Sequence, residues 1–431
     1  MKAIPVARPI LGEEEAAAAR RAILSGWVVQ GPEVAAFEKE FAAAVGAGHA
    51  VACSSGTAAL HLALLAMDIG PGDEIITVSH SFIATANAVR YVGATPVFVD
   101  VEPQTGNINP DLIEPAITAK TKAILAVHQL GMPCDLARIL KIANNNGLPV
   151  IEDAACAVGS EIRAIEEYRG RGKGPESSFP LPQTPSPNPL KGWEGGMGGG
   201  QGAALPGPPP TSSTGFVPIG RPHGLLATFS FHPRKVITTG DGGMVTGTDP
   251  EIMARIARLR THSMSVSTAE RHRAKGVVFE EYQELGCNYR LSDIQAAVGR
   301  EQLKRLPGMV AARRRLAARY LEELANHPYI LLPQEPPWAR SNWQSFWITL
   351  APQCPVSQIE VLQSLKALGI DTRRGVMCAH REPAYQDLPP RFPLPVSEML
   401  RDRSIILPLY PDMTEPEQER VVAALLDSLG Q

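Results

Sequence analysis

One lysine, placed just past an apolar strand, is the first residue of this chain that could do covalent chemistry. Lys235 lies in the segment 229–236, just past an apolar strand expected to end at Phe231, and a glycine-rich turn follows at residues 238–243. A lysine at a strand end, beside glycines that let backbone approach a ligand closely, is placed to form a Schiff base with an aldehyde cofactor. A surface lysine beside an ordinary turn is the simpler interpretation of this segment alone. The choice depends on the rest of the chain.

The segment from Cys53 to Ala59 has the composition of a phosphate site. It contains a strand end, a turn of small residues with Ser55, Gly56 and Thr57, and the start of a helix. Backbone N–H groups at a helix N-terminus, together with hydroxyl groups and the helix dipole, suit a phosphate monoester. An ordinary strand-to-helix turn with a Ser or Thr cap is the alternative.

An aromatic residue and an acid follow two other predicted strands. Phe82 comes shortly after a strand that ends at Val78, where it could stack on a flat heterocycle or lie in the core in a helix's first turn. Asp153 ends the strand 149–153, at the sheet edge where open α/β sheets bind ligands, and could hold a pyridine nitrogen protonated. Capping of a helix is the alternative for Asp153. Glu152 is the weaker candidate, since neighbours on a strand face opposite ways.

These features occur together and in chain order. A phosphate turn, an aromatic plate, an acid for a ring nitrogen and a Schiff-base lysine are the groups that handle pyridoxal 5'-phosphate, and Ser230 is a further phosphate donor. Their combination is far less probable by chance than any one of them. We therefore predict a pyridoxal-phosphate site formed by strand ends.

Short apolar runs alternate with helical stretches from residue 49 to residue 153, which predicts an α/β fold with a mostly parallel sheet flanked by helices. Helices are expected to begin near Thr57, Phe82, Pro110 and Asp135. Further strands are expected at 225–231 and 243–246, and Ser292 and Thr414 are expected to open later helices as capping boxes. The predicted strands of the first part are 50–53, 74–78, 96–100, 123–127 and 149–153.

The chain divides into three predicted parts: an N-terminal arm at 1–30, a large cofactor-binding domain at 31–300 and a small C-terminal α/β domain at 301–431. Inside the large domain, residues 164–222 are rich in Gly, Pro and Ser. Such a stretch cannot bury enough apolar surface to offset the entropy of ordering, so we expect a disordered insertion.

Composition excludes several classes of partner. Lys and Arg number 41 against 44 Asp and Glu, without a long block of one sign, so neither nucleic acid nor an anionic membrane is an expected partner. The six cysteines are scattered and form no metal-binding or disulfide pattern. The N-terminus has no signal peptide pattern and no run is long enough to span a membrane, so we expect a soluble, cytoplasmic protein without a metal site.

With these residues in view, the chain resembles the DegT/DnrJ/EryC1/StrS family of fold type I pyridoxal-phosphate enzymes, the sugar aminotransferases. The resemblance covers nearly everything outside the insertion. The matching motifs are Ser25-Gly26-Trp27 with Gln30-Gly31-Pro32, residues 54–60, residues 93–100, His128-Gln129-Leu130-Gly131, Glu152-Asp153-Ala154-Ala155, residues 229–235, residues 286–297 and Leu407-Pro408-Leu409-Tyr410-Pro411.

The resemblance implies a role for each candidate residue. Lys235 would carry the cofactor, Asp153 would contact its ring nitrogen and Phe82 would stack on the ring. Asn288 would reach the phosphate from the partner subunit, which implies a homodimer with shared active sites. The remaining assignments are Gly56, Thr57 and Ser230, with neighbouring Ser55, at the phosphate, and Trp27 and His380 near the sugar substrate.

Three departures from the family pattern stand out. Cys156 occupies a position where many members carry a Gln or His that touches the cofactor, and Cys287 replaces a common aromatic residue. The insertion falls where the family has a short loop.

The resemblance implies transamination from an amino acid, most simply L-glutamate, to a keto-sugar, nucleotide-linked, in amino-sugar or surface polysaccharide biosynthesis. Members that deoxygenate sugars carry His at the lysine position, and Lys235 therefore favours transamination. Three alternatives stay open: a keto-cyclitol acceptor, a non-catalytic regulatory or sensor protein, and a sugar-nucleotide binding module without a cofactor.

Overall fold

The computed structural model describes residues 3–164, 215–266 and 276–430. Its centre is a seven-stranded sheet within these residues, in the order β1-β9-β8-β5-β4-β2-β3. All adjacent pairs from β8 to β3 are parallel, and β9 runs antiparallel to both of its neighbours. The strands are β1 (His49–Cys53), β2 (Glu74–Val78), β3 (Thr95–Val99), β4 (Thr121–Val127), β5 (Val150–Asp153), β8 (Leu226–Ser230) and β9 (Gly243–Gly247). The predicted strands are confirmed.

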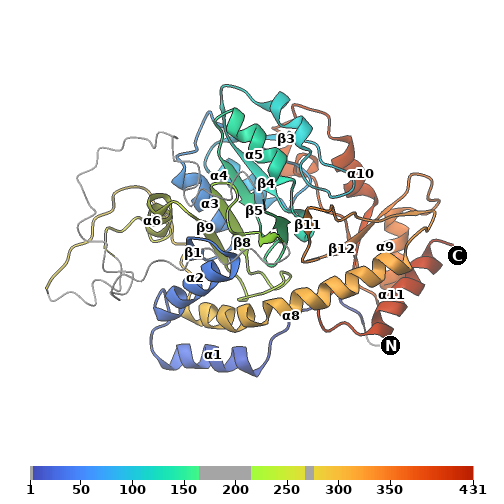
Figure 1. Ribbon diagram of the computed structural model, residues 1–431, viewed down its shortest axis with the longest axis horizontal. Coiled ribbons are helices and arrows are strands. Elements are labelled where there is room, and N and C mark those ends of the chain that lie inside the picture. Colours follow the sequence, from blue (N-terminus) through green and yellow to red (C-terminus); the bar gives the residue numbers. More distant parts are fainter. Residues whose placement is uncertain (1–2, 165–214, 267–275, 431) are drawn as a thin grey trace.

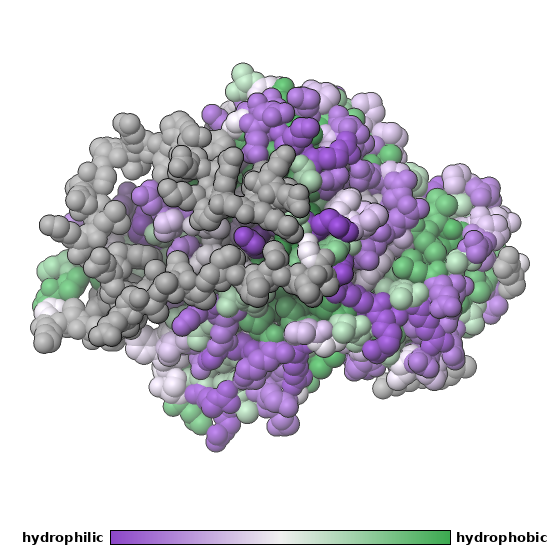
Figure 2. Space-filling view, viewed as in Figure 1, coloured by the Kyte–Doolittle hydropathy of each residue, from purple (hydrophilic) through white to green (hydrophobic). Residues whose placement is uncertain are grey.

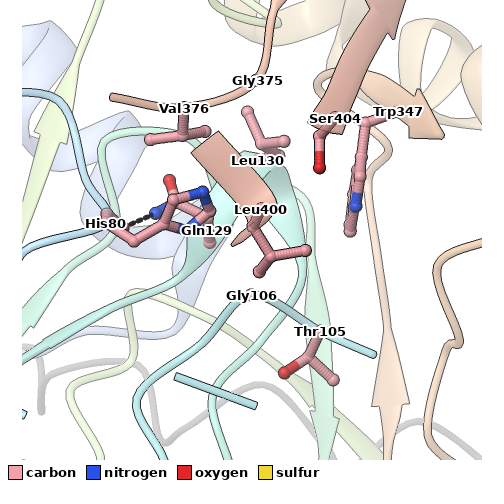
Figure 3. Close-up of a pocket in the computed structure, with 10 residues that line it drawn as sticks. All are labelled: His80, Thr105, Gly106, Gln129, Leu130, Trp347, Gly375, Val376, Leu400 and Ser404. Atoms are coloured by element: carbon pink, nitrogen blue, oxygen red, sulfur yellow. Dashed lines mark hydrogen bonds between the residues drawn. The ribbon is translucent and has the colours of Figure 1, made fainter. Parts of the chain in front are cut away.

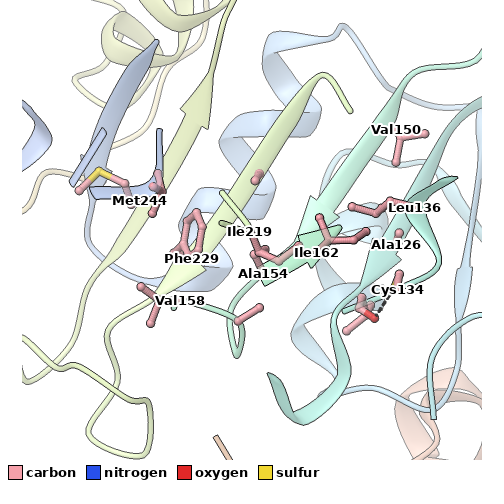
Figure 4. Close-up of a cluster of buried hydrophobic side chains, with 14 of the residues drawn as sticks. Ala126, Cys134, Leu136, Val150, Ala154, Val158, Ile162, Ile219, Phe229 and Met244 are labelled. Atoms are coloured by element: carbon pink, nitrogen blue, oxygen red, sulfur yellow. Dashed lines mark hydrogen bonds between the residues drawn. The ribbon is translucent and has the colours of Figure 1, made fainter. Parts of the chain in front are cut away.

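Helices cover both faces of this sheet (Figure 1). On one face pack α2 (Pro32–Val45), α5 (Leu136–Asn145) and the first half of α8 (Asp293–Glu323); on the other pack α3 (Gly56–Ala66), α4 (Ala84–Tyr91) and α6 (Pro250–Leu259). Because side chains alternate along a strand, Ile76 joins the first core and Ile75 the second. Figure 4 shows part of the first core, with Phe229 and Met244 on adjacent strands. The predicted α/β class is confirmed.

Helix α8 joins the large sheet to the C-terminal part and crosses the lower side of the molecule in Figure 1. It begins at the predicted capping box, in which the Ser292 hydroxyl accepts from Gln295 N and the Gln295 side chain accepts from Ser292 N. The N-terminal helix α1 (Glu13–Leu24) packs along it. Since α8 runs through residue 300, the proposed domain division falls inside one continuous helix and stays a prediction.

The C-terminal part has its own antiparallel sheet in the order β10-β12-β14-β13. Its strands are β10 (Ile330–Leu331), β12 (Phe346–Leu350), β13 (Arg373–Arg374) and β14 (Ser404–Leu407), and its helices are α9 (Gln358–Ala367), α10 (Pro395–Arg403) and α11 (Glu415–Ser428). Helix α11 begins at the predicted Thr414 capping box. A separate core of buried residues, including Tyr320 from α8 and Phe346, lies under this sheet.

The described ends of the Gly/Pro/Ser-rich segment are ordered, and Ala164 N donates to Gly215 O at 2.9 Å. Residues 216–218 form β7 (Phe216–Pro218), which pairs antiparallel with β6 (Glu161–Arg163), and β11 (Ala339–Arg340) completes this small sheet. Val217 is buried and pairs with Ile162, so the apolar residues near the end of the segment are enough to order it. The disorder expected for 164–222 is therefore wrong for 215–222, and residues 165–214 lie outside the described residues.

The helix expected from Pro110 is also wrong. Asn109 caps as predicted, accepting from Asp111 N, but only two short 3₁₀ turns follow, Pro110–Leu112 and Glu114–Ala116. Pro115 accounts for this difference, because a proline inside a helix removes a donor and clashes with the preceding turn. In the described parts of the chain, no helix combines the length and apolar character that a membrane crossing requires.

Candidate active site

The predicted site residues lie at one edge of the central sheet. Phe82 follows β2, Asp153 ends β5, and Ser230 ends β8, whose continuation carries Lys235. These three strands are parallel, so their carboxyl ends share this edge. Ser55 reaches the same region from β1, because β1 lies two strands from β8 and its end, Cys53, pairs with Gly243.

Lys235 lies in a tight turn between β8 and β9. Its backbone N–H donates to His232 O at 2.8 Å, and the returning chain is fixed by a 2.8 Å bond from Phe231 N to Gly242 O. The Lys235 ammonium donates to the Cys156 Sγ at 3.0 Å. Cys156, one of the two residues that depart from the family pattern, is therefore the direct partner of the candidate nucleophile.

Asp153 is buried, with 5% of its surface exposed, and both carboxylate oxygens have donors. Thr85 Oγ1 donates to Asp153 Oδ2 at 2.8 Å, and Ala155 N donates to Oδ1 at 3.2 Å. Ser81 lies behind Thr85, with 2.8 Å between the two hydroxyl oxygens. Each carboxylate oxygen keeps a lone pair for another donor. The bond to Ala155 closes a turn, so Asp153 caps a turn and not a helix.

Glu152 faces the opposite side, as strand alternation requires. Its carboxylate lies 3.1 Å from His128 Nε2 and accepts from the backbone of His223 at 2.7 Å and of Gly224 at 3.0 Å. Burial opposes ionisation of Glu152, but the hydrogen bond from His128 and these donors hold its pKa below the usual range. Glu152 thus fastens the chain that enters β8 and stays away from the candidate site.

The turn before α3 supplies anion-binding groups. Ser55 is the N-cap of α3 and accepts from Ala58 N at 3.1 Å, whereas the N–H groups of Gly56 and Thr57, in the first turn, have no partner inside the helix. A Cβ on Gly56 would lie 2.7 Å from the Ser230 Cβ, and one on Gly243 would lie 2.3 Å from the Ser55 carbonyl oxygen. These two glycines let the turn and the strand end meet.

Phe82 lies in the turn between β2 and α4, and 62% of its surface is exposed. The alternative of a core phenylalanine is therefore wrong. An exposed ring at this edge is available to stack on a ligand.

Of the three remaining predicted residues, Asn288 and Trp27 lie in loops and His380 lies in a 3₁₀ turn, Ala379–Arg381. Asn288 accepts from Arg290 Nε at 3.0 Å, and its neighbour Tyr289 accepts from Ser54 N at 2.8 Å, so this segment touches the phosphate turn of its own chain. Trp27 lies in the loop that runs against the start of α8, where Gly31 N donates to Asp293 at 2.6 Å.

His380 is nearly buried and both of its ring nitrogens have partners. Nδ1 lies 2.6 Å from Ser79 Oγ, and Nε2 lies 3.0 Å from Glu398 Oε1. This chain of contacts ties the C-terminal part to the segment that carries Phe82. A substrate that hydrogen-bonded to the His380 ring would have to displace one of these partners.

Sequence reasoning missed four polar residues: Ser79, Ser81, Thr85 and Glu398. Ser79 is a near neighbour of Phe82 in the sequence, but its partner His380 is 301 positions away, whereas Ser81 contacts Thr85 only four positions further along. Thr85 lies in the first turn of the helix. Because helical side chains point towards the N-terminus of the helix, this position could have indicated that the Thr85 side chain is directed back towards the sheet edge.

A small cavity lies beside this edge but is separate from the candidate site. His80, next to the Phe82 segment, lines it together with Gln129 from the large sheet side and Trp347 and Leu400 from the C-terminal part (Figure 3). Its walls are mostly apolar, and its volume is too small for a substrate. Burial lowers the pKa of His80 to about 4.

The residues at the sheet edge fit pyridoxal phosphate. A glycine cradle at a helix N-terminus suits the phosphate, a buried acid with free acceptor capacity suits the ring nitrogen, and an amine at the same edge suits the aldehyde.

Comparisons with known proteins agree with this chemistry. The chain matches the DegT/DnrJ/EryC1/StrS aminotransferase family over residues 9–174 and 218–426. DesV from S. venezuelae, solved in complex with a ketimine intermediate, is 31% identical, with a TM-score of 0.80 and 100% of both chains covered. The aminotransferase TlmJ from Streptoalloteichus hindustanus is 27% identical, with a TM-score of 0.80 and 99% of both chains covered.

A putative sugar aminotransferase, Spr1654 from Streptococcus pneumoniae in its PMP form, shares the fold at 22% identity, with a TM-score of 0.80 over 99% of each chain. The fold and the site define an aminotransferase of the pyridoxal-phosphate class. The chain belongs to the DegT/DnrJ/EryC1/StrS aminotransferase family, and it is a pyridoxal-phosphate-dependent sugar aminotransferase.

Proposed function

We propose that this enzyme moves the amino group of L-glutamate to a nucleotide-linked keto-sugar, in amino-sugar or surface polysaccharide biosynthesis. The observation that carries the proposal is the joint placement of Lys235, Asp153 and the Ser55–Thr57 turn at one sheet edge, in a chain 31% identical to DesV. A lysine at the attachment position supports transamination over deoxygenation.

The proposal assigns each residue a role. Lys235 Nζ holds the cofactor covalently, and Asp153 keeps its ring nitrogen protonated by a charge-assisted hydrogen bond worth about 1.5–3 kcal/mol. Thr85 orients Asp153, and Phe82 stacks on the ring. The phosphate is bound by Gly56, Thr57 and Ser230, with Ser55 as helix cap and Asn288 contributed by a partner subunit, and Trp27 and His380 lie towards the sugar.

The bound cofactor supplies an aldehyde carbon and an electron sink. The chain supplies the proton chemistry. With the cofactor bound, a neutral Lys235 Nζ would accept the α-proton of the amino acid, and the Asp153 carboxylate would stabilise positive charge on the ring nitrogen. Cys156, 3.0 Å from Nζ, supplies a weak acceptor that orients the amine between these steps.

Isotope transfer tests this proposal. Wild-type enzyme incubated with ¹⁵N-labelled L-glutamate and a panel of nucleotide-linked keto-sugars and keto-cyclitols should pass label to at least one nucleotide-linked keto-sugar, as read by mass spectrometry. A Lys235→Ala variant should show no transfer above background. Label found only in a keto-cyclitol, or equal transfer by the variant, would contradict the proposal.

We also propose a homodimer with shared sites. Large apolar side chains are exposed around the cofactor edge and on the loop after α6, including Phe82, Val277, Phe279 and Leu285. In Figure 2 hydrophobic residues stand out at the left margin, where this loop projects in Figure 1. Exposed apolar side chains gathered in this way are typical of surfaces that bind another protein chain.

A further inference from the structure

The amine of Lys235 lies against the sulfur of a free cysteine. Lys235 Nζ donates to Cys156 Sγ at 3.0 Å, and both side chains are half-buried. The pair brings together a thiol that a small oxidant can reach from solvent and an amine that touches the same sulfur. An oxidised sulfur at this position would therefore have a nitrogen nucleophile already in contact with it.

The main chain fixes this approach from both sides. The Asn342 side chain donates from Nδ2 to Cys156 O and to Val158 O, each at 2.8 Å, which ties the cysteine segment to the C-terminal part. The Lys235 backbone is held by its own bond to His232 O at 2.8 Å. The two residues are 79 positions apart in the sequence, so the fold and not local chain geometry brings the sulfur and the nitrogen together. The flexible four-carbon stem of the lysine lets Nζ close the remaining gap.

Other cysteines have different surroundings. Burial raises the pKa of the Cys53 thiol and of the Cys378 thiol to about 12, which leaves little of the thiolate that reacts with oxidants. Cys354 is half-buried like Cys156, but its sulfur donates to a backbone carbonyl, Val356 O, at 3.3 Å. In the described part of the chain, Cys156 is the cysteine whose sulfur accepts a hydrogen bond from an amine.

We propose that Cys156 and Lys235 form a covalent modification site, at which oxidation by a peroxide joins the sulfur to the amine and blocks the nitrogen that holds the cofactor. In the first step the Cys156 thiol is oxidised to a sulfenic acid, and hydrogen peroxide is reduced to water. In the second step Lys235 Nζ attacks the sulfur. The S–N bond forms as the S–O bond breaks, and the sulfenic hydroxyl leaves as water with one proton from the amine. One peroxide is consumed, and the product is a sulfenamide.

A thiol reductant reverses the modification. Its thiolate attacks the Cys156 sulfur and releases the Lys235 amine, and a second thiol group then restores the Cys156 thiol as the reductant becomes a disulfide. The effect on activity rests on the proposed function, because the same amine holds the cofactor. The cross-link can form only while that amine is free, in the chain without cofactor or in holoenzyme after an amino donor has displaced it.

Peptide mapping of the full-length protein tests the cross-link. The chain freed of cofactor is treated with hydrogen peroxide, digested without reductant and analysed by mass spectrometry. The peptides of Cys156 and Lys235 should appear joined, with a mass about 2 Da below their sum, since two hydrogen atoms are lost. Dithiothreitol should separate them. The fraction of protein that takes up added pyridoxal phosphate, measured by absorbance, should fall in proportion to the cross-linked fraction.

Two serine variants separate this site from general oxidation. Cys156→Ser removes the sulfur, so peroxide should produce no cross-link to Lys235, and cofactor uptake should match that of the untreated variant. Cys354→Ser is the matched control, because it removes another half-buried sulfur that has no amine donor. Its cross-linked fraction should equal that of the wild type.

Oxygen addition to Cys156 without a joined peptide would overturn the cross-link, as would equal loss of cofactor uptake in the wild type and in Cys156→Ser. In holoenzyme, L-glutamate should increase the cross-linked fraction, because it frees the amine. If the wild type transfers nitrogen but the cofactor-free chain does not cross-link, the cross-link fails and the proposed function stands. If the cofactor-free chain cross-links, but glutamate has no effect on holoenzyme and no nitrogen is transferred, the proposed function fails and the cross-link stands.

Discussion

At the scale of single residues, the candidate site depends on a buried relay that orients one acid. Asp153 Oδ2 accepts from Thr85 Oγ1 at 2.8 Å, and Ser81 lies behind it. Thr85→Val removes this donor while keeping the shape of the side chain. We expect kcat/KM to fall about 10-fold, equivalent to about 1.4 kcal/mol, because Asp153 loses one hydrogen bond that fixes its orientation.

Thr77→Val is the control for this prediction. Thr77 lies on β2, and its buried hydroxyl donates to the backbone carbonyl of Leu125 on β4 at 2.9 Å. This bond does not involve Asp153. Both variants should lose a similar free energy of unfolding, about 1 kcal/mol, and only Thr85→Val should lose activity. Equal losses of kcat/KM would show that the Thr85 bond has no special role.

His80 makes the stability of the fold sensitive to acid. Burial lowers its pKa to about 4, from 6.5 for an ordinary histidine, so the unfolded chain takes up a proton before the folded chain does. The part of the unfolding free energy that depends on neutral His80 is fully present above about pH 6.5 and is lost as the pH falls towards 4. The whole loss amounts to about 3 kcal/mol. His80→Leu should flatten the pH dependence of the unfolding free energy in this range, measured by urea denaturation. Parallel pH profiles for the two proteins would contradict this.

At the scale of elements, two glycines allow the N-terminus of α3 to meet the ends of β8 and β9. A Cβ on Gly243 would lie 2.3 Å from Ser55 O, so Gly243→Ala must push back the turn that we propose to bind phosphate. We expect a loss of about 1–3 kcal/mol in unfolding free energy, with weaker retention of cofactor on dialysis. Gly308→Ala in α8, where a Cβ meets nothing within 4 Å, should instead be neutral or stabilising by up to about 1 kcal/mol. Full cofactor retention by Gly243→Ala would contradict the cradle.

The same scale shows what the sequence could and could not predict. The strands, the position of Asp153 at a strand end and the position of Lys235 in the turn after β8 were predictable, because apolar runs and the turns that follow them are local signals. The helix predicted from Pro110 does not form, because Pro115 interrupts it despite the favourable Asn109 cap. The partners of His380 could not be predicted, since Ser79 lies 301 positions away and only the packing of the C-terminal part brings them together.

At the scale of the whole molecule, the exposed apolar residues predict self-association. Leu285 has 95% of its surface exposed and directly precedes the segment 286–297, which contains Asn288, the residue that the resemblance assigns to a shared site. Leu285→Arg should shift the protein from dimer towards monomer in analytical ultracentrifugation and weaken cofactor retention, because a charge would be buried in the interface. Ile359→Arg is the control: Ile359 is 63% exposed on α9 in the C-terminal part, and this variant should remain a dimer. A monomeric wild-type protein, or dissociation of both variants alike, would contradict this.

The central claim is that a single amine holds the cofactor. Reduction of the purified holoenzyme with borohydride, followed by digestion and mass spectrometry, locates that amine directly. The account predicts the pyridoxyl mass on the peptide that contains Lys235, with no label in a Lys235→Ala protein treated in the same way. Label on a different lysine, or an unlabelled peptide from coloured enzyme, would contradict it.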